Sequence, residues 1–175
     1  MKITILDSEY LSLSKRNSDL KSLIKFKKKL FPEIIQISFL KCSNIYLENN
    51  QKRLNILIKI KQKLPIRIEK LTKITSNILK KQGSSFKESM SLIDRFIDDK
   101  STLIANGEDL RLLKLNIKYN NLNKRKKKLV YYVNLKKILN RIYKKQNHDT
   151  ENLNKVFKFK IEFNPHNSSN DCIIL

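Results

Sequence analysis

A stretch of 39 residues, 110–148, contains no carboxylate and carries thirteen lysine and arginine side chains. Because a buried ammonium group without a partner is costly and like charges repel, the fold must place this stretch on its surface. Residues 87–109 are sorted the other way, with six acidic and three basic side chains. Charge is therefore separated by region within a chain whose formal net charge is +22.

A positive field of this density indicates a polyanionic partner, either nucleic acid or an anionic membrane surface. Lysine far outnumbers arginine, which favours contacts with backbone phosphates over the bidentate reading of bases. Part of the lysine excess has a second explanation, because the abundance of Lys, Asn and Ile and the scarcity of Ala and Gly are typical of an AT-rich genome. Such drift enriches lysine everywhere and does not explain an acid-free run.

Most of the apolar residues have helical spacing. Three segments, 18–31, 66–82 and 85–97, carry an apolar stripe, and Ser85 and Glu88 form the capping-box pattern at the start of the third. After a turn at Asn106-Gly107, Glu108 and Asp109 favour the start of another helix, which breaks near 120–123 and resumes by residue 129. The segment 32–40 is too uniformly apolar for its period to be read, and helix is slightly favoured there.

Strand patterns are fewer. Residues 157–163 alternate strictly between apolar and polar, and residues 1–6 and 54–60 are candidate pairing partners. We therefore expect a mainly α fold of helical hairpins or a bundle, with at most a small β-sheet from the chain ends. The predicted organisation is a basic helical domain over 1–146, a linker and C-terminal strand over 147–163, and a flexible tail over 164–175.

The basic run supplies the candidate nucleic-acid-binding residues. Lysines and arginines at helical spacing suit phosphate contacts, and tyrosines beside them suit stacking on unpaired bases. The candidate phosphate-binding residues are Lys124, Arg125, Lys126, Lys127, Lys128, Lys136, Lys137, Arg141, Lys144 and Lys145, and the candidate stacking residues are Tyr131, Tyr132 and Tyr143. For Tyr131 and Tyr132, a place in the core is an equal alternative.

The last four residues, Cys172-Ile173-Ile174-Leu175, match the C-a-a-X prenylation box, so Cys172 is a candidate lipidation site. One prenyl chain binds a membrane only marginally, so the basic run would have to act as the second signal. A chance match in an isoleucine-rich chain is the other explanation.

Catalysis finds little support in the residue pattern. His148 and His166 are the only histidines, and neither has a partner at a spacing that indicates metal binding or activation of a nucleophile. The cluster Asp94, Asp98 and Asp99 is typical of an exposed acidic helix face, and no glycine-rich phosphate loop is present. We expect no enzyme activity, no cofactor and no metal.

The sequence thus favours a non-catalytic RNA-binding protein of a ribosome or other ribonucleoprotein particle. Two alternatives stay open: a prenylated peripheral membrane protein, and a helical adaptor or assembly factor that binds an acidic protein. The N-terminus lacks the pattern of a signal peptide, and no apolar stretch is long enough to span a membrane, so the expected location is the cytoplasm or an organellar matrix.

Overall fold

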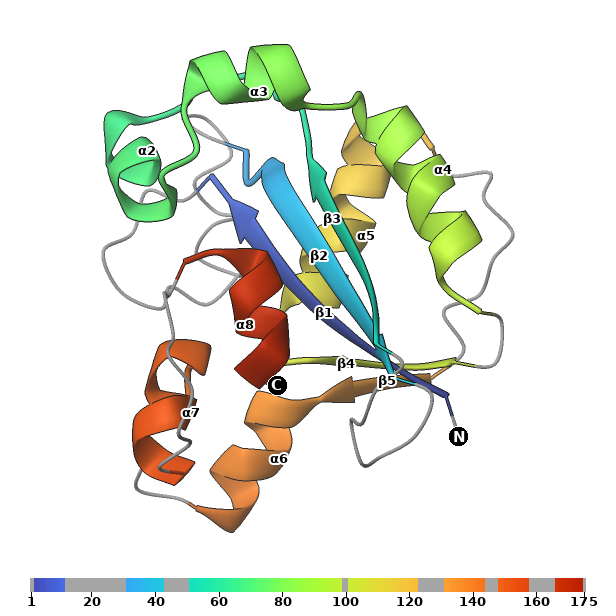
Figure 1. The fold of residues 1–175 in the computed structure, drawn as a ribbon, viewed down its shortest axis with the longest axis vertical. Coiled ribbons are helices and arrows are strands. Elements are labelled where there is room, and N and C mark those ends of the chain that lie inside the picture. Colours follow the sequence, from blue (N-terminus) through green and yellow to red (C-terminus); the bar gives the residue numbers. More distant parts are fainter. Residues whose placement is uncertain are drawn as a thin grey trace.

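The architecture is a five-stranded mixed sheet with helices on both faces, seen in a computed structural model that describes residues 2–11, 31–42, 51–98, 101–122, 131–143, 148–157 and 166–174. The strand order is β3-β2-β1-β4-β5 (Figure 1). The strands are β1 (Lys2–Tyr10), β2 (Ile34–Cys42), β3 (Lys52–Leu57), β4 (Ser101–Ala105) and β5 (Tyr131–Asn134). β1, β2 and β3 pair antiparallel, whereas β4 pairs parallel with both β1 and β5.

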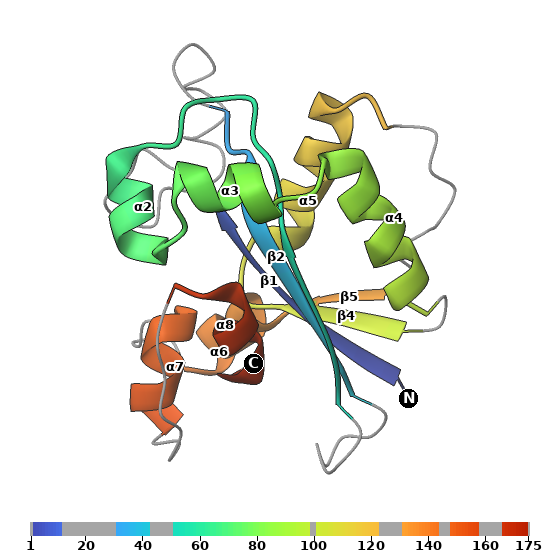
Figure 2. The same cartoon turned by 45° about the horizontal axis from the view of Figure 1, so that its top comes forward.

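The described helices surround this sheet on its two faces and at one end (Figures 1 and 2). They are α2 (Ile66–Thr72), α3 (Ser76–Gln82), α4 (Phe86–Phe96), α5 (Asp109–Tyr119), α6 (Leu135–Ile142), α7 (Thr150–Phe157) and α8 (Ser168–Ile174). Within the described ranges, no helix combines the length and the apolar character needed to cross a membrane.

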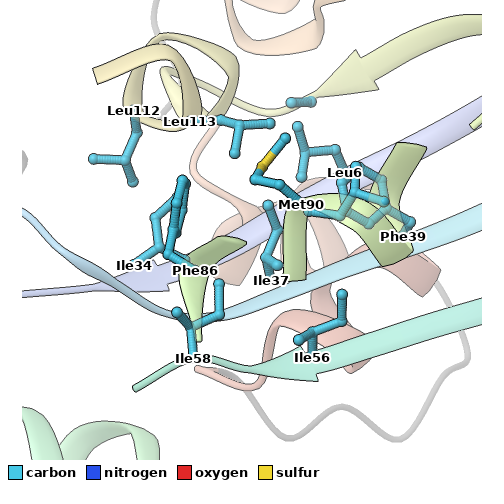
Figure 3. Packing of buried hydrophobic residues seen from close by; sticks show 12 residues of the cluster. Leu6, Ile34, Ile37, Phe39, Ile56, Ile58, Phe86, Met90, Leu112 and Leu113 are labelled. Carbon is cyan, nitrogen blue, oxygen red and sulfur yellow. The ribbon is translucent and has the colours of Figure 1, made fainter. Parts of the chain in front are cut away.

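The main core lies between the sheet and the pair α4 and α5. Leu6, Ile37 and Phe39 of β1 and β2 pack there against Phe86 and Met90 of α4, with leucines of α5 completing the cluster (Figure 3). A smaller cluster on the opposite face joins Ile5 and Leu40 to Cys172 of α8. Because β1 is covered on both faces, its consecutive side chains serve different layers.

The expectation of a mainly helical fold is wrong. Most of the segment 32–40, for which helix was slightly favoured, belongs to the interior strand β2, and this strand is buried on both faces, which explains its uniformly apolar sequence. The basic run begins with α5, as expected, but its part after residue 129, expected to be all helical, forms β5 before α6. Strand formation at 1–6 and 54–60 is confirmed by β1 and β3.

Several helix predictions are confirmed in part. The capping box is present, with Ser85 accepting from the Glu88 backbone and Glu88 accepting from the Ser85 backbone. The predicted helix 66–82 is two helices, α2 and α3, separated by Lys73 in a left-handed conformation. Residues 18–30 of the predicted helix 18–31 lie outside the described residues.

The C-terminal predictions fare differently. The segment expected to be a flexible tail contains α8, which packs on β1 and β2. Phe157 ends α7, and the rest of the expected strand 157–163 lies outside the described residues.

Candidate active site

Carboxylates from both ends of the chain converge beside the end of β1. Asp7 and Glu9 of β1 and Asp171 of α8 each offer an oxygen, and these atoms lie within 4.8 Å of one another. Asp109, the first residue of α5, joins them through Ser8, whose hydroxyl donates a 2.6 Å hydrogen bond to Asp109 Oδ1. Asp7 and Asp171 are both largely buried, at 8% and 7% exposure, which separates this cluster from an ordinary acidic surface patch.

The two-residue period of β1 explains how this strand serves two helices at once. Ile3 and Ile5 lie in the cluster with Cys172 of α8, and Asp7 and Glu9 continue that face to the strand end. The alternate residues Leu6 and Ser8 face the other layer, where α5 begins.

α8 is fixed to the sheet by polar contacts that place Asp171. The hydroxyl groups of Ser168 and Ser38 lie 2.7 Å apart, and the Ser168 backbone donates to Gln36 Oε1 at 3.3 Å. The Cys172 thiol donates to the Ser38 carbonyl at 3.4 Å. These contacts hold Asp171 on the face of β1 that carries the other two acids.

The loop before α5 is held equally firmly. The Tyr132 hydroxyl donates to the Gly107 carbonyl at 2.8 Å, and the Asn134 side-chain amide donates to the same oxygen. Gly107 has φ 144°, a conformation that a residue with a side chain rarely adopts. Strand β5 therefore fixes the turn from which Asp109 projects.

Burial and mutual repulsion dominate the electrostatics of this cluster. Burial first, and then the charges of Asp109, Asp171 and Glu9, raise the pKa of Asp7 well above its ordinary value. Burial, followed by the charges of Asp171 and Asp109, raises the pKa of Glu9 to about 8. Burial raises the pKa of Asp109 to about 6, against the opposing effect of the Ser8 hydrogen bond.

This donor set fits a hard divalent cation. The ligands offered are all carboxylate oxygens, which suit Mg²⁺ or Mn²⁺ better than the nitrogen and sulfur ligands that zinc prefers. A cation would also relieve the repulsion that raises these pKa values. The expectation of no metal considered only one acidic group, Asp94, Asp98 and Asp99, of which Asp99 lies outside the described residues. Asp98 instead forms ion pairs with Lys2 and Lys41, at 3.2 and 3.3 Å.

Three of the predicted phosphate-binding residues, Lys136, Lys137 and Arg141, are described, and they lie on α6 and not in the acidic cluster. Lys137 and Arg141 are exposed on that helix, whereas Lys136 forms an ion pair with Asp149. The remaining members of the predicted set, Lys124, Arg125, Lys126, Lys127, Lys128, Lys144 and Lys145, lie outside the described residues.

The three candidate stacking tyrosines have different environments. Tyr131 is 64% exposed and Tyr143 is 44% exposed, with the Tyr143 ring in an edge contact with Phe157. Tyr132 is half-buried and bound to Gly107, so its role is structural. Cys172, the candidate lipidation site, is only 1% exposed within α8, and a transferase could reach it only if α8 left the sheet.

The two histidines also differ. His148 is fully buried, with its Nδ1 2.8 Å from Asn140 Oδ1. His166 stands two residues before α8 and has φ 64°, the left-handed conformation. His166 therefore lies just before the helix that carries Asp171, and Asp171 follows it by five residues.

The acidic residues were not predicted because they form no cluster along the sequence. A signal was present: Asp7 and Glu9 directly follow the predicted strand 1–6 and have the spacing that puts two acids on one face of an extended segment. Asp109 follows the predicted Asn-Gly turn, and His166 and Asp171 are the chemically distinctive residues of the last segment. Nothing in the residue pattern brought these three segments together.

Comparison with known proteins gives a family match over nearly the whole chain. The family model described as Exonuclease (RNase_T) matches residues 4–175. No curated protein matches the sequence.

Solved structures share the fold at low sequence identity. The nuclease domain of 3′hExo, described as a DEDDh family member bound to rAMP, has a TM-score of 0.75 and 16% identity, and the match covers 99% of this chain and 86% of that one. Cell-death related nuclease 4 has a TM-score of 0.73 and 15% identity, with 99% and 60% covered. E. coli exonuclease I, in a zinc-ion-bound complex with single-stranded DNA, has a TM-score of 0.71 and 14% identity, with 99% and 38% covered.

The family match overturns the expectation of a non-catalytic RNA-binding protein of a ribonucleoprotein particle, and with it the expectation that the chain is not an enzyme. The two alternatives, a prenylated membrane protein and an adaptor, fall with it. The more general expectation of a nucleic-acid partner agrees with an exonuclease family. The chain spans 60% of the length of cell-death related nuclease 4 and 38% of E. coli exonuclease I.

Proposed function

Because the chain belongs to the RNase_T exonuclease family, we propose that it hydrolyses phosphodiester bonds at the end of a polynucleotide, at the site formed by Asp7, Glu9, Asp109 and Asp171. One observation carries the proposal: acids from β1 and α8 meet within 4.8 Å in a largely buried setting. Burying like charges close together lowers stability, so such a cluster indicates a functional site.

The carboxylates fit divalent cations, which when bound would neutralise the charge of the phosphate and lower the pKa of an attacking water. The carboxylates would hold the cations, and the contacts of Ser168 and Ser8 would keep Asp171 and Asp109 in place. Rigid placement of this kind is what a hydrolytic site requires.

We assign the role of general base to His166. Hydrolysis requires that a proton leave the attacking water, and imidazole is the side chain whose ordinary pKa suits that transfer near neutral pH. His166 leads directly into the helix of Asp171. Replacement of His166 by alanine should lower kcat by roughly 10²- to 10⁴-fold and remove the acidic limb of the pH–rate profile.

For the substrate we propose a single-stranded polynucleotide, RNA in the first place, whose backbone passes α6. That helix exposes Lys137 and Arg141 for phosphate contacts, and Tyr143 and Phe157 offer exposed aromatic surface for stacking. α6 and α7 lie near α8 in both views (Figures 1 and 2), so a strand that ends at Asp171 could extend along them.

The test is degradation of end-labelled 20-nucleotide oligomers of ribo- and deoxyribonucleotides with Mg²⁺ or Mn²⁺, and with EDTA as the metal-free control. Wild-type protein should shorten the oligomer stepwise from one end, and Asp171→Asn should be inactive while retaining the native circular dichroism spectrum. Asp94→Asn on α4 removes the same charge elsewhere and should remain active. Full activity of Asp171→Asn, or no cleavage by the wild type of either oligomer, would refute the proposal.

A further inference from the structure

A cavity lies within the connection between β3 and α4, and none of the acidic residues of the candidate site lines it. Its volume is about 570 Å³, and it opens between the segment 59–64 and helix α3. Its apolar lining is formed by Ile60, Leu64 and Leu79, of which the two leucines are buried. Cavities of this size are typical of small-molecule sites.

Cationic side chains surround the apolar lining. Lys59, Lys63 and Lys80 all line the cavity and are all exposed. The pKa of Glu88 is lowered mainly by its hydrogen bonds with Ser85 and to a smaller extent by the charge of Lys59, so part of the Lys59 charge is compensated. Lys63 and Lys80 form no ion pair with any residue in the described ranges. The cavity thus combines an apolar floor with two uncompensated positive charges.

The walls are fixed by backbone hydrogen bonds, so the cavity is preformed. The Lys59 backbone donates to the Ser84 carbonyl at 2.9 Å, and the Lys61 and Gln62 backbones donate to the Glu33 carboxylate at 2.9 and 3.0 Å. On the other wall, Ser76 donates to Glu69 through both its backbone and its hydroxyl, at 2.9 Å each. Glu69 is thereby engaged with α3.

Gly83 allows the two walls to approach. A Cβ at this position would lie 2.5 Å from the Leu79 carbonyl and 3.1 Å from the Lys59 backbone nitrogen. A residue with a side chain would therefore force the segment 59–64 away from α3 and alter the cavity. The glycine is required for close approach, since the Gly83 φ is not in the left-handed region.

The apolar lining connects this cavity to the strand of the acidic site. Leu64 and Leu79 belong to the cluster that also buries Leu11, and Leu11 follows Glu9 by two residues. The Leu11 backbone donates to the carbonyl of Glu33, the residue whose carboxylate holds the cavity wall. The cavity shares no lining residue with the acidic cluster, and the two are connected through Leu11 and Glu33.

We propose that this cavity binds a nucleotide, with the base against Ile60, Leu64 and Leu79 and the phosphate at Lys63 and Lys80. The choice of ligand class rests on the proposed function, which brings nucleotides to this protein, and on the pairing of an apolar surface with unpaired cations. Two sources supply the same chemistry: a free mononucleotide, such as a product of hydrolysis, and one unit of a bound strand.

The test compares two double variants of the full chain in EDTA, where hydrolysis cannot interfere. Lys63→Gln/Lys80→Gln alters the cavity, and Lys70→Gln/Lys87→Gln removes the same charge from exposed positions of α2 and α4 outside it. Adenosine monophosphate is the first probe, followed by calorimetry, and a fluorescein-labelled 10-nucleotide oligomer is the second, followed by anisotropy.

The cavity variant should lose about tenfold in affinity for adenosine monophosphate, the oligomer or both, and the control less than about twofold. Loss for the mononucleotide alone identifies a free nucleotide as the ligand, and loss for the oligomer alone identifies a unit of the strand. In the second case the slope of log affinity against log salt should fall by about 0.7.

Equal losses in the two double variants would show general electrostatic attraction and overturn the proposal, as would unchanged binding of both probes. The outcome is separable from that of the proposed function. If the wild type cleaves oligomers but the wild type and both double variants bind the two probes equally well, the cavity proposal alone is refuted. If the wild type does not cleave oligomers but only the cavity variant loses affinity for a probe, the proposed nuclease activity alone is refuted.

Discussion

Replacing Glu9 by glutamine should stabilise the metal-free protein at pH 8 while abolishing hydrolysis. Burial and the neighbouring acids raise the pKa of Glu9 from 4.5 to about 8. Between these two pH values, the folded protein retains a proton that the unfolded chain has lost. Folding then takes up a proton, so stability falls as the pH rises from 4.5 to 8 and changes no further with this group outside that window.

The magnitude follows from the same two values. Each pH unit of the window corresponds to about 1.4 kcal/mol, which gives an upper bound of about 5 kcal/mol at pH 8. Glu9 is half-buried, so solvent screening lowers the expected gain to about 2–3 kcal/mol. Glutamine removes the titration and keeps the shape of the side chain. At pH 5 the two proteins should differ by less than about 1 kcal/mol.

Urea unfolding in EDTA at pH 5 and pH 8, with circular dichroism as the probe, measures both differences. Asp94→Asn is the matched control and should show no comparable rise in relative stability with pH. Equal stability differences for Glu9→Gln at the two pH values, or a loss of stability at pH 8, would refute the argument that Glu9 is held under electrostatic strain. Saturating Mn²⁺ should narrow the gap at pH 8, because a cation bound to the carboxylates stabilises the wild type selectively.

Three further outcomes test the supports of the site. Tyr132→Phe should cost about 1 kcal/mol in stability and lower kcat more than it raises KM, because the Gly107 carbonyl loses a donor and the turn before Asp109 loosens; unchanged kcat would contradict this. Ser85→Ala should cost about 1 kcal/mol in thermal unfolding by removing the cap of α4, without altering cleavage. Burial raises the pKa of the Cys172 thiol well above its ordinary value, so a thiol reagent should modify Cys172 in the native protein only as fast as α8 detaches, and modification in urea should be fast.

Local patterns predicted the local structure well. The Ser85–Glu88 capping box, the turn at Gly107 and the strand of residues 1–6 all depend on neighbours in sequence, and each is present. β2 could not be recognised because a central strand buried on both faces has no alternation to read. Without β2, the predicted strands at 1–6 and 54–60 lack the strand that lies between them, so the sequence predicts only a small sheet.

The acidic site could not be predicted for a different reason. Asp7 and Asp171 are near opposite ends of the chain, and their proximity depends on the pairing of β1 with β2 and on the docking of α8 through Ser168 and Ser38. Neither contact has a signature in sequence. The Asn, Ser and His residues that dominate the segment before Asp171 predict a disordered tail. One of these polar residues, Ser168, instead fastens α8 to the sheet through Ser38 and Gln36.

The basic composition and the acidic site have a common explanation in the charge of the substrate. A cluster of four carboxylates repels a polynucleotide, and a bound cation offsets that repulsion only within the site itself. On the proposed function, the formal net charge of +22 attracts the strand over longer distances, and exposed residues such as Lys137 and Arg141 contribute to that attraction. The composition therefore indicated the correct class of ligand, whereas the chemistry depends on a few acids that the excess of lysine concealed. Raising the salt concentration should accordingly raise KM strongly and leave kcat nearly unchanged. Lysines at a distance from the site increase the rate at which the substrate binds, whereas the acids act on the bond that is broken.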